Sequence, residues 1–153
     1  MAHALNLVIP IGQDQHTQAK LRALENAFSE TFQPLMDKAF RDSSVIHFAR
    51  VFVIDDKYLV LVAEYDGPSQ DYVNLFRRAL GSVFRELFSM IDGRHGDDVL
   101  NGPNALSEFV RLYNQRSLGV SVDGHTDIMG NLDGYLFSAY ADRKVTEISS
   151  KLE

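Results

Sequence analysis

The sequence predicts an α+β domain in which helices pack on an antiparallel sheet. Two β-rich runs, residues 45–54 and 58–67, are separated by the polar residues 55–57, which is typical of a hairpin. A helical periodicity precedes this hairpin and another follows it, and a further β-rich run lies near each end of the chain. The predicted order is β-α-β-β-α-β, with an extra short helix before the last strand and a helix at the C-terminus.

The N-terminal half begins with a strand over residues 3–11, which ends in the turn sequence "GQDQ". From Thr17 onward, apolar residues recur at three- and four-residue steps, as on one face of a helix: Leu21, Leu24, Phe28, Phe32, Leu35 and Met36. Proline lacks an amide hydrogen and clashes with the preceding turn, so Pro34 should end or kink this helix near Gln33. The loop "RDSS" then leads into the hairpin.

The C-terminal half begins at "DGPSQD", which supplies a turn and the start of a broad aromatic helix over residues 72–91. Residues 92–104 are polar and glycine-rich, as in a surface loop, and a short helix should begin near Pro103. Residues 118–133 are irregular. The run "GYLFSAYA" (134–141) predicts the last strand, and residues 142–153 predict a final short helix.

Composition and charge narrow the classes of function. The 153 residues suit a single domain spanning 1–153, and 45% hydrophobic with 24% charged residues indicates a folded globular chain. A net charge of −6 lacks the electrostatic footprint of a nucleic-acid or anionic-membrane binder. The absence of cysteine excludes disulfides and thiolate metal sites. With no secretory leader pattern and no apolar stretch of membrane-spanning length, we expect a soluble, cytoplasmic protein.

The order of elements matches the split β-α-β arrangement called ferredoxin-like. Right-handed crossovers would place the first and third strands in the centre of the sheet, with helices on one face. If the hairpin turn lies at Asp56 and Lys57, the bulky side chains of both hairpin strands share the helix-covered face: Phe48, Phe52, Leu59, Leu61 and Tyr65, together with Arg50. Valine and alanine then dominate the other face, where His47 and Glu64 also point.

That second face should not stay uncovered. A contiguous apolar surface of this size usually marks an interaction site, and a symmetric homodimer is the simplest cover. Two such sheets would enclose an interior into which His47 and Glu64 project. Arg50 would need an acidic group or a helix C-terminus as its partner, because an unpaired buried guanidinium is costly. A slip of one residue in the hairpin would exchange the two faces.

The stretch "HFARVFVIDD…LVLVAEYDG", with "LVIPI" before it and "YLFSAYADRKVTEI" at the end, resembles a group of uncharacterised bacterial proteins of the ferredoxin-like dimeric α+β barrel superfamily. The superfamily includes dye-decolorising haem peroxidases, antibiotic-biosynthesis monooxygenases and chlorite dismutase-like proteins. The resemblance implies a barrel closed by two copies. In the peroxidases a Gly-x-x-Asp-Gly motif, an arginine and a histidine surround the haem. Here "GNLDG" fits that pattern at Asp133, and Arg50 and His95 are the corresponding candidates.

Other groups of polar residues are weaker candidates. "DGRHGDD" places His95 among carboxylates, and "DGHTD" does the same for His125, but neither holds two ligands on one rigid element. We therefore interpret both as solvated loops and predict no metal site. No phosphate loop, dinucleotide fingerprint or nucleophile elbow is present.

The sequence supports two classes of function. In the first, the chain binds a small apolar or aromatic molecule in a pocket at the open sheet face, with His47, Glu64 and Arg50 as the polar groups. In the second, it is an oxidative enzyme, either haem-dependent or cofactor-free, in which His47 acts as base or ligand. The residues alone do not decide whether the chain is catalytic or which cofactor it uses.

Overall fold

The computed structural model describes residues 2–67, 74–75, 77–92, 101, 103–120, 134–140 and 143–152. Its elements in chain order are β1 (Ala2–Pro10), α1 (Gln15–Ala27), η1 (Phe28–Phe32), α2 (Gln33–Ser43), β2 (Ile46–Ile54), β3 (Tyr58–Asp66), α4 (Gly81–Phe88), α6 (Pro103–Tyr113) and α7 (Val145–Ser149). Residues 74–75 and 77–79 are also helical. The predicted α+β class with an antiparallel sheet is confirmed, as are the hairpin, the extra helix before residues 134–141 and the C-terminal helix.

The described sheet has three strands in the order β1-β3-β2. β3 is central as predicted, whereas β1, which was also predicted in the centre, lies at an edge of the described sheet. Residues 134–140 are not in a strand, and the prediction of a last strand is wrong for them. Instead, the residues that follow α6 form hydrogen bonds with the middle of the outer edge of β1. The Asn6 amide donates to Oδ1 of Asn114 over 2.9 Å, and the Gln115 amide donates to the Asn6 carbonyl over 2.7 Å. The Tyr135 amide donates to the Leu118 carbonyl, away from β1.

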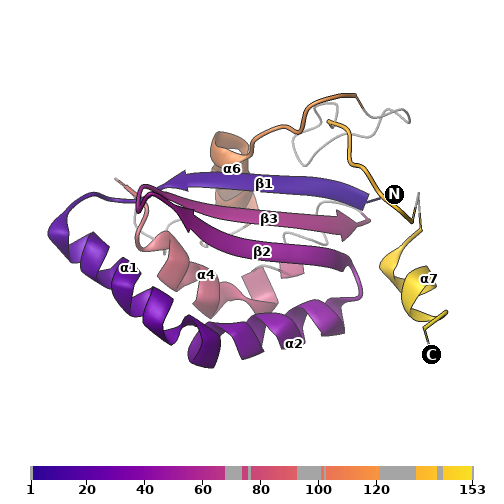
Figure 1. Cartoon of the computed structure of the whole chain (residues 1–153), viewed down its shortest axis with the longest axis horizontal. Helices are drawn as coiled ribbons and strands as arrows, with labels where there is room; N and C mark the ends of the chain where they lie inside the picture. Colours follow the sequence, from indigo (N-terminus) through magenta and orange to yellow (C-terminus); the bar gives the residue numbers. More distant parts are fainter. Residues whose placement is uncertain are drawn as a thin grey trace.

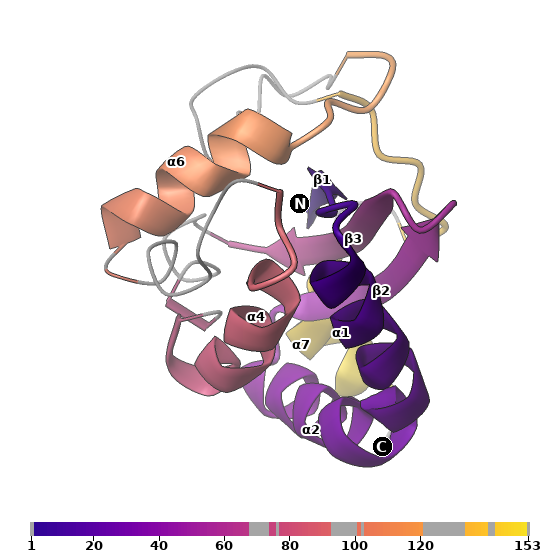
Figure 2. The same cartoon turned by 90° about the vertical axis from the view of Figure 1, so that its left-hand side faces the viewer.

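Helices cover one side of this sheet. In the view of Figure 1, α4 and α6 lie behind the strands and α1 and α2 run below them, while α7 lies beyond one end of the sheet. Figure 2 shows the same arrangement from the side, with no described helix on the opposite face. We call that uncovered side the open face.

The hydrophobic core lies between the sheet and these helices. Alternate residues of β1 and β3 are buried there, as the two-residue period of a strand requires: Leu5, Leu7, Ile9, Leu59, Leu61, Ala63 and Tyr65. The helices contribute Leu21, Phe84, Phe88 and Phe109, each almost fully buried. Rings of Phe88 and Phe109 lie 4.5 Å apart between centroids, which joins α4 to α6.

The first helix changes character before Pro34, as predicted. Residues 28–32 form a π-helix, in which the Gln33 amide donates to the Phe28 carbonyl, and α2 begins at Gln33 with the proline in its first turn. Proline has no amide hydrogen and its ring displaces the carbonyl four residues earlier, which disfavours regular α-helical bonding at this point. Figure 1 shows α1 and α2 meeting at a bend.

The hairpin register differs from the predicted one by a single residue. Phe52 pairs with Val60 and Ile54 with Tyr58, whereas a turn at Asp56 and Lys57 would have paired Phe52 with Leu61. Asp55 and Asp56 both adopt positive φ, at 51° and 55°, and the Lys57 amide donates to the Ile54 carbonyl. Aspartate tolerates the left-handed conformation better than most residues, so the turn forms one residue earlier than expected.

This shift exchanges the faces of β2, so the predicted placement of its side chains is wrong. Ala49, Val51 and Val53 pack toward the core, and Phe48, Arg50 and Phe52 lie on the open face. The placement predicted for β3 is confirmed, because Leu59, Leu61 and Tyr65 are buried in the core. The open face therefore carries larger apolar groups than the valines and alanines expected from the sequence.

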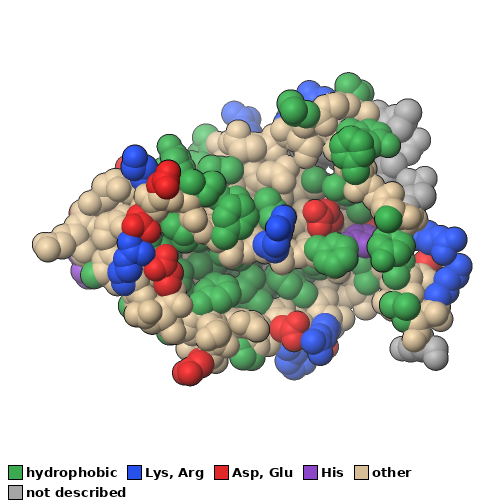
Figure 3. Space-filling view, viewed as in Figure 1, with side chains coloured by type: hydrophobic (Ala, Val, Ile, Leu, Met, Phe, Trp, Pro, Cys, Tyr) green, Lys and Arg blue, Asp and Glu red, His purple; other side chains and the backbone are tan. Residues whose placement is uncertain are grey.

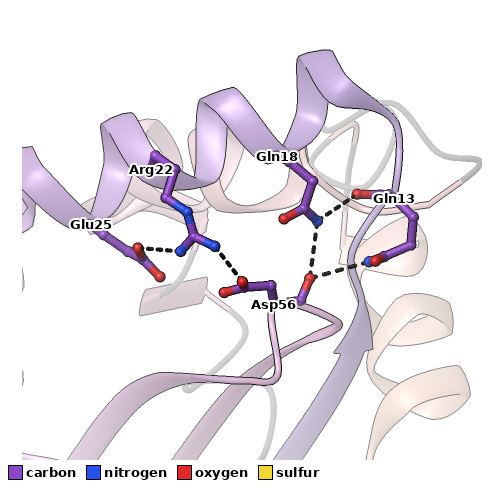
Figure 4. Close-up of polar contacts among 6 residues, drawn as sticks. Gln13, Gln18, Arg22, Glu25 and Asp56 are labelled. Carbon is purple, nitrogen blue, oxygen red and sulfur yellow. Dashed lines mark hydrogen bonds and ion pairs between the residues drawn. The ribbon is translucent and has the colours of Figure 1, made fainter.

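Side chains of α1 and of the residues just before it hold the hairpin turn in place. As Figure 4 shows, Gln13 and Gln18 both donate to the Asp56 carbonyl, over 3.1 Å and 3.0 Å, and Arg22 forms an ion pair with the Asp56 carboxylate. Hydrogen bonds to Asp56 and then to Glu25 raise the pKa of Arg22 above its usual value. These contacts fix the turn end of the open face relative to α1.

Candidate functional site

The register of the sheet arranges the open face as rows of three side chains, one from each strand in the order β1, β3, β2. Starting at the hairpin turn, the rows are Pro10–Tyr58–Ile54, Val8–Val60–Phe52, Asn6–Val62–Arg50 and Ala4–Glu64–Phe48. The two rows nearest the turn contain no charged residue. The next two hold the charged pair Arg50 and Glu64. The face is therefore apolar at one end and partly polar at the other.

Large apolar groups on this face are accessible to solvent. Phe48 has 67% of its surface exposed and Phe52 has 43%, values that are unusual for phenylalanine in the middle of a strand. Val60 lies on the central strand between Val8 and Phe52 and is buried. Figure 3 shows hydrophobic side chains spread across this face, with isolated charged groups and a histidine among them.

Arg50 and Glu64 lie on neighbouring strands and in neighbouring rows. Residues in such diagonal positions are roughly 7–8 Å apart at the backbone. Arg50 is exposed and Glu64 is half-buried. In the described part of the chain neither side chain forms a hydrogen bond or an ion pair. Both charges are thus available to a molecule that covers the face.

His47 lies at the polar end and has a carboxylate partner that the sequence did not predict. Its Nε2 atom is 2.9 Å from Oδ1 of Asp66, not of Glu64, and the two side chains are only 12% and 6% exposed. The register of β2 shifts between Ile46 and Phe48, which leaves His47 in a β-bulge without a partner in the ladder. Bulges redirect side chains and are common near functional sites.

Asp66 also fixes the C-terminal segment. Its second oxygen, Oδ2, accepts a 2.7 Å hydrogen bond from the Val145 amide at the first residue of α7. One carboxylate therefore connects β2, β3 and α7. Asp66 lies two residues beyond Glu64 on β3. The His47–Asp66 pair is therefore roughly 7 Å from the Glu64 side chain along the strand.

The pair has a definite chemical character. A carboxylate oxygen accepts a hydrogen bond, so Nε2 is the donor of this pair. When the ring is neutral, Nδ1 is then left as an acceptor. Nδ1 has no hydrogen-bond partner among the described residues. A histidine oriented in this way can accept a hydrogen bond from a ligand hydroxyl or take a proton from it.

The other residues singled out in the sequence are not part of this arrangement. His95, His125 and Asp133, with the loops that hold them, lie outside the described residues. Within the described ranges, no group of three or more histidine and acidic side chains is placed to hold a metal ion. None of the helices described is both long enough and apolar enough to cross a membrane.

Comparisons with models of protein families, with curated proteins and with solved structures find no match to this chain. The candidate site therefore rests on the geometry of the chain itself.

The structure brings two of the three predicted site residues, Arg50 and Glu64, onto the same part of the open face, and places His47 near its polar end. It adds Asp66, Phe48 and Phe52. The two phenylalanines could have been found from the adjacent aspartates 55 and 56, which favour a turn at those positions. No feature of the sequence indicates the bulge that directs His47 to Asp66.

Proposed function

We propose that the open face binds a small molecule with an apolar or aromatic body and a polar end, in a space closed by a second copy of this chain. The observation that supports this most strongly is the exposure of Phe48 and Phe52 beside two charged groups, Arg50 and Glu64, that have no partner among the described residues. Exposed apolar surface of this extent is characteristic of ligand and protein interaction sites.

A second copy is favoured because the face is complementary to itself. In a two-fold symmetric pair, if one residue of the first copy contacts a second residue of the other copy, the same contact occurs again with the copies exchanged. Two such faces packed together would bring Arg50 and Glu64 of both copies into the same enclosed space. The apolar rows beside them would exclude water.

The size of the face is relevant to this arrangement. Three strands of nine residues cover about 14 Å by 30 Å at the usual strand spacing and rise. A stable interface buries about 800 Å² on each partner, so additional surface is needed. Residues 134–140 pass the N-terminal end of β1 on the side of the open face (Figures 1 and 2) and carry the exposed Tyr135 and Phe137. These exposed aromatic side chains would extend the apolar surface beyond the three strands.

The change from apolar to charged rows along the open face determines how a ligand would lie on it. Its apolar body would pack over Val60, Phe52 and Tyr58, and its polar end would reach Arg50 and Nδ1 of His47. An anionic or hydroxylated aromatic compound has this distribution of polarity.

Two measurements test the proposal together. Sedimentation should give a dimeric mass for the wild-type chain, and the Phe52→Ser variant should be monomeric, because it removes apolar surface at the centre of the proposed interface. Fluorescence of anilinonaphthalene sulfonate should rise with the wild-type protein and rise several-fold less with Arg50→Gln. Leu112→Ser is the matched control, since Leu112 is an exposed leucine on α6. A monomeric wild-type chain that does not bind the dye would contradict the proposal.

Oxidative chemistry is a second candidate, favoured by the His47–Asp66 pair at the polar end of the face. His47 would act as a base toward a bound phenol or enol, either without a cofactor or beside a haem. An absorption spectrum with added haemin tests the haem version. For the cofactor-free version, His47→Gln should abolish oxygen consumption with the bound compound and leave its affinity within about threefold, on the order of one hydrogen bond.

A further inference from the structure

A pocket that is open to solvent lies on the opposite side of the sheet, between the helices. It has a volume of about 240 Å³ and is lined from α1, η1 and the C-terminal end of α4. Pockets for drug-sized ligands have volumes of about 300–1,000 Å³, so this one suits a smaller molecule. Figure 2 shows α1 and α4 next to each other on this side. We call it the helix cavity; it shares no residue with the open face.

Small side chains and the π-helix together create the helix cavity. Ala23 and Ala27 project from α1 where larger residues would fill the space, and Leu24, Phe32 and Met90 complete an apolar lining. The π-helix over residues 28–32 widens the chain immediately after α1 and brings Thr31 and Phe32 to the cavity. Short π-helical insertions are frequently found at functional sites. The cavity and the insertion are separate observations that coincide at one place.

The two charged groups at the helix cavity are of opposite sign and come from different helices. Lys20 lies on α1 and Glu86 on α4, and both line the cavity. In the described part of the chain, neither side chain forms an ion pair or a hydrogen bond. The Ser89 hydroxyl donates to the backbone carbonyl of Glu86 and not to its carboxylate, which is left for a ligand.

An ammonium and a carboxylate beside an apolar lining complement one kind of small molecule. We propose that the helix cavity binds a free α-amino acid with an apolar side chain. Lys20 pairs with the ligand carboxylate, Glu86 pairs with its ammonium group, and the apolar side chain packs against Leu24, Phe32 and Met90. A fatty acid would leave Glu86 without a partner, and an apolar amine would leave Lys20 without one. The amino acid satisfies both charges.

The test uses L-leucine as the probe and the full-length chain labelled with ¹⁵N. Titration should shift amide resonances of α1, residues 28–32 and α4, and leave those of β2 unchanged. N-acetyl-leucine lacks the ammonium and leucinamide lacks the carboxylate. Each should bind about two- to fivefold more weakly than leucine, the range expected for exposed ion pairs.

Matched variants assign each charge to its residue. With Glu86→Gln, leucine and N-acetyl-leucine should bind equally, and with Lys20→Met, leucine and leucinamide should bind equally. Lys38→Met is the control, because Lys38 is paired with Asp42 on α2, away from the cavity. Ala27→Leu should fill the cavity and abolish the shifts. The inference is wrong if leucine causes no shifts, if isocaproate or isopentylamine binds as tightly as leucine, or if the charge variants leave the preference unchanged.

Discussion

Oδ1 of Asp66 lies 2.9 Å from Nε2 of His47, while Oδ2 of the same residue accepts a hydrogen bond from the amide of Val145. Both oxygens of a buried carboxylate are thus engaged by donors, one from β2 and one from α7. In Asp66→Ala both of these donors would lose their acceptor. Leaving a buried donor unpaired costs about 1–3 kcal/mol. We predict that the free energy of unfolding of this variant, measured by urea denaturation, is lower by that amount. Hydrogen exchange of the Val145 amide should also become faster.

The control for Asp66→Ala is Asp37→Ala. Asp37 is exposed on α2 and pairs only with Arg41, one helical turn later. Such pairs contribute about 0.3–0.5 kcal/mol, so this change should be nearly silent. Equal stability of the two variants would show that the carboxylate of Asp66 does not connect the strands to α7.

The register of the hairpin gives a second prediction. Ala49 and Ala63 are directly opposite each other on β2 and β3. The backbone of Asn6 forms its hydrogen bonds on the outer side of β1. The backbone of its opposite residue, Val62, therefore forms hydrogen bonds with β2, and the backbone of Ala63 forms them with β1. Ala49 and Ala63 are therefore a non-hydrogen-bonded pair, with Cα atoms about 4.5 Å apart, close enough for a disulfide. The double variant Ala49→Cys, Ala63→Cys should form one on air oxidation.

The register predicted from a turn at Asp56 and Lys57 would instead place Arg50 opposite Ala63. The variant Arg50→Cys, Ala63→Cys provides the comparison, and its thiols should stay free because the two side chains point to opposite faces. The chain has no cysteine of its own, so thiol titration before and after oxidation reports directly on the pair. A disulfide in the second variant and none in the first would refute the observed register.

The hairpin also shows where sequence reasoning succeeds and where it stops. Periodicity located both strands and the interruption at Pro34, because burial imposes a two-residue period on strands and a period near 3.6 on helices. It could not choose between turns one residue apart, since that choice depends on whether Asp55 and Asp56 accept positive φ. The consequence is large, because a one-residue slip moves every side chain of a strand to the other face.

The remaining discrepancies arise from contacts between distant parts of the chain. Residues 134–140 have the composition of a strand, yet Asn114 and Gln115 already bond the middle of the β1 edge where that strand would pair. His47 was expected near Glu64, but a bulge directs it to Asp66. Neither event has a local signature. Alternation alone thus predicted the residues that β3 contributes to the open face, but neither those of β2 nor the polar arrangement.

The start of α1 makes stability depend on pH. Asp14 is the N-cap: its carboxylate accepts hydrogen bonds from the Thr17 hydroxyl and the Thr17 amide, and these bonds lower its pKa. A group whose pKa is lower in the folded state stabilises the fold above its unfolded pKa, about 3.9, and this contribution is lost as the pH falls through the folded value. Asp14→Ala should therefore be less stable than wild type at pH 7, and the difference should shrink below about pH 4.

Asp14→Asn separates capping from titration. Asparagine caps helices about as well as aspartate but does not ionise, so the difference in urea midpoint between Asp14→Asn and Asp14→Ala should not change with pH. If the difference in free energy of unfolding between wild type and Asp14→Ala stayed constant down to pH 2, the ionised carboxylate would not be the source of the stabilisation.

The packing of α6 provides the last prediction. Phe109 is fully buried, with its ring centroid 4.5 Å from that of Phe88 and 4.9 Å from that of Tyr113. Replacing a buried phenylalanine by alanine removes apolar contacts and leaves a cavity, which costs about 3–5 kcal/mol. Leu112 lies three residues further along the same helix and is 52% exposed, so Leu112→Ala should cost less than about 1 kcal/mol. Urea unfolding of the two variants measures both. A small effect at Phe109 would mean that α6 does not belong to the core, and the anchoring of residues 114–115 on the β1 edge would lose its support.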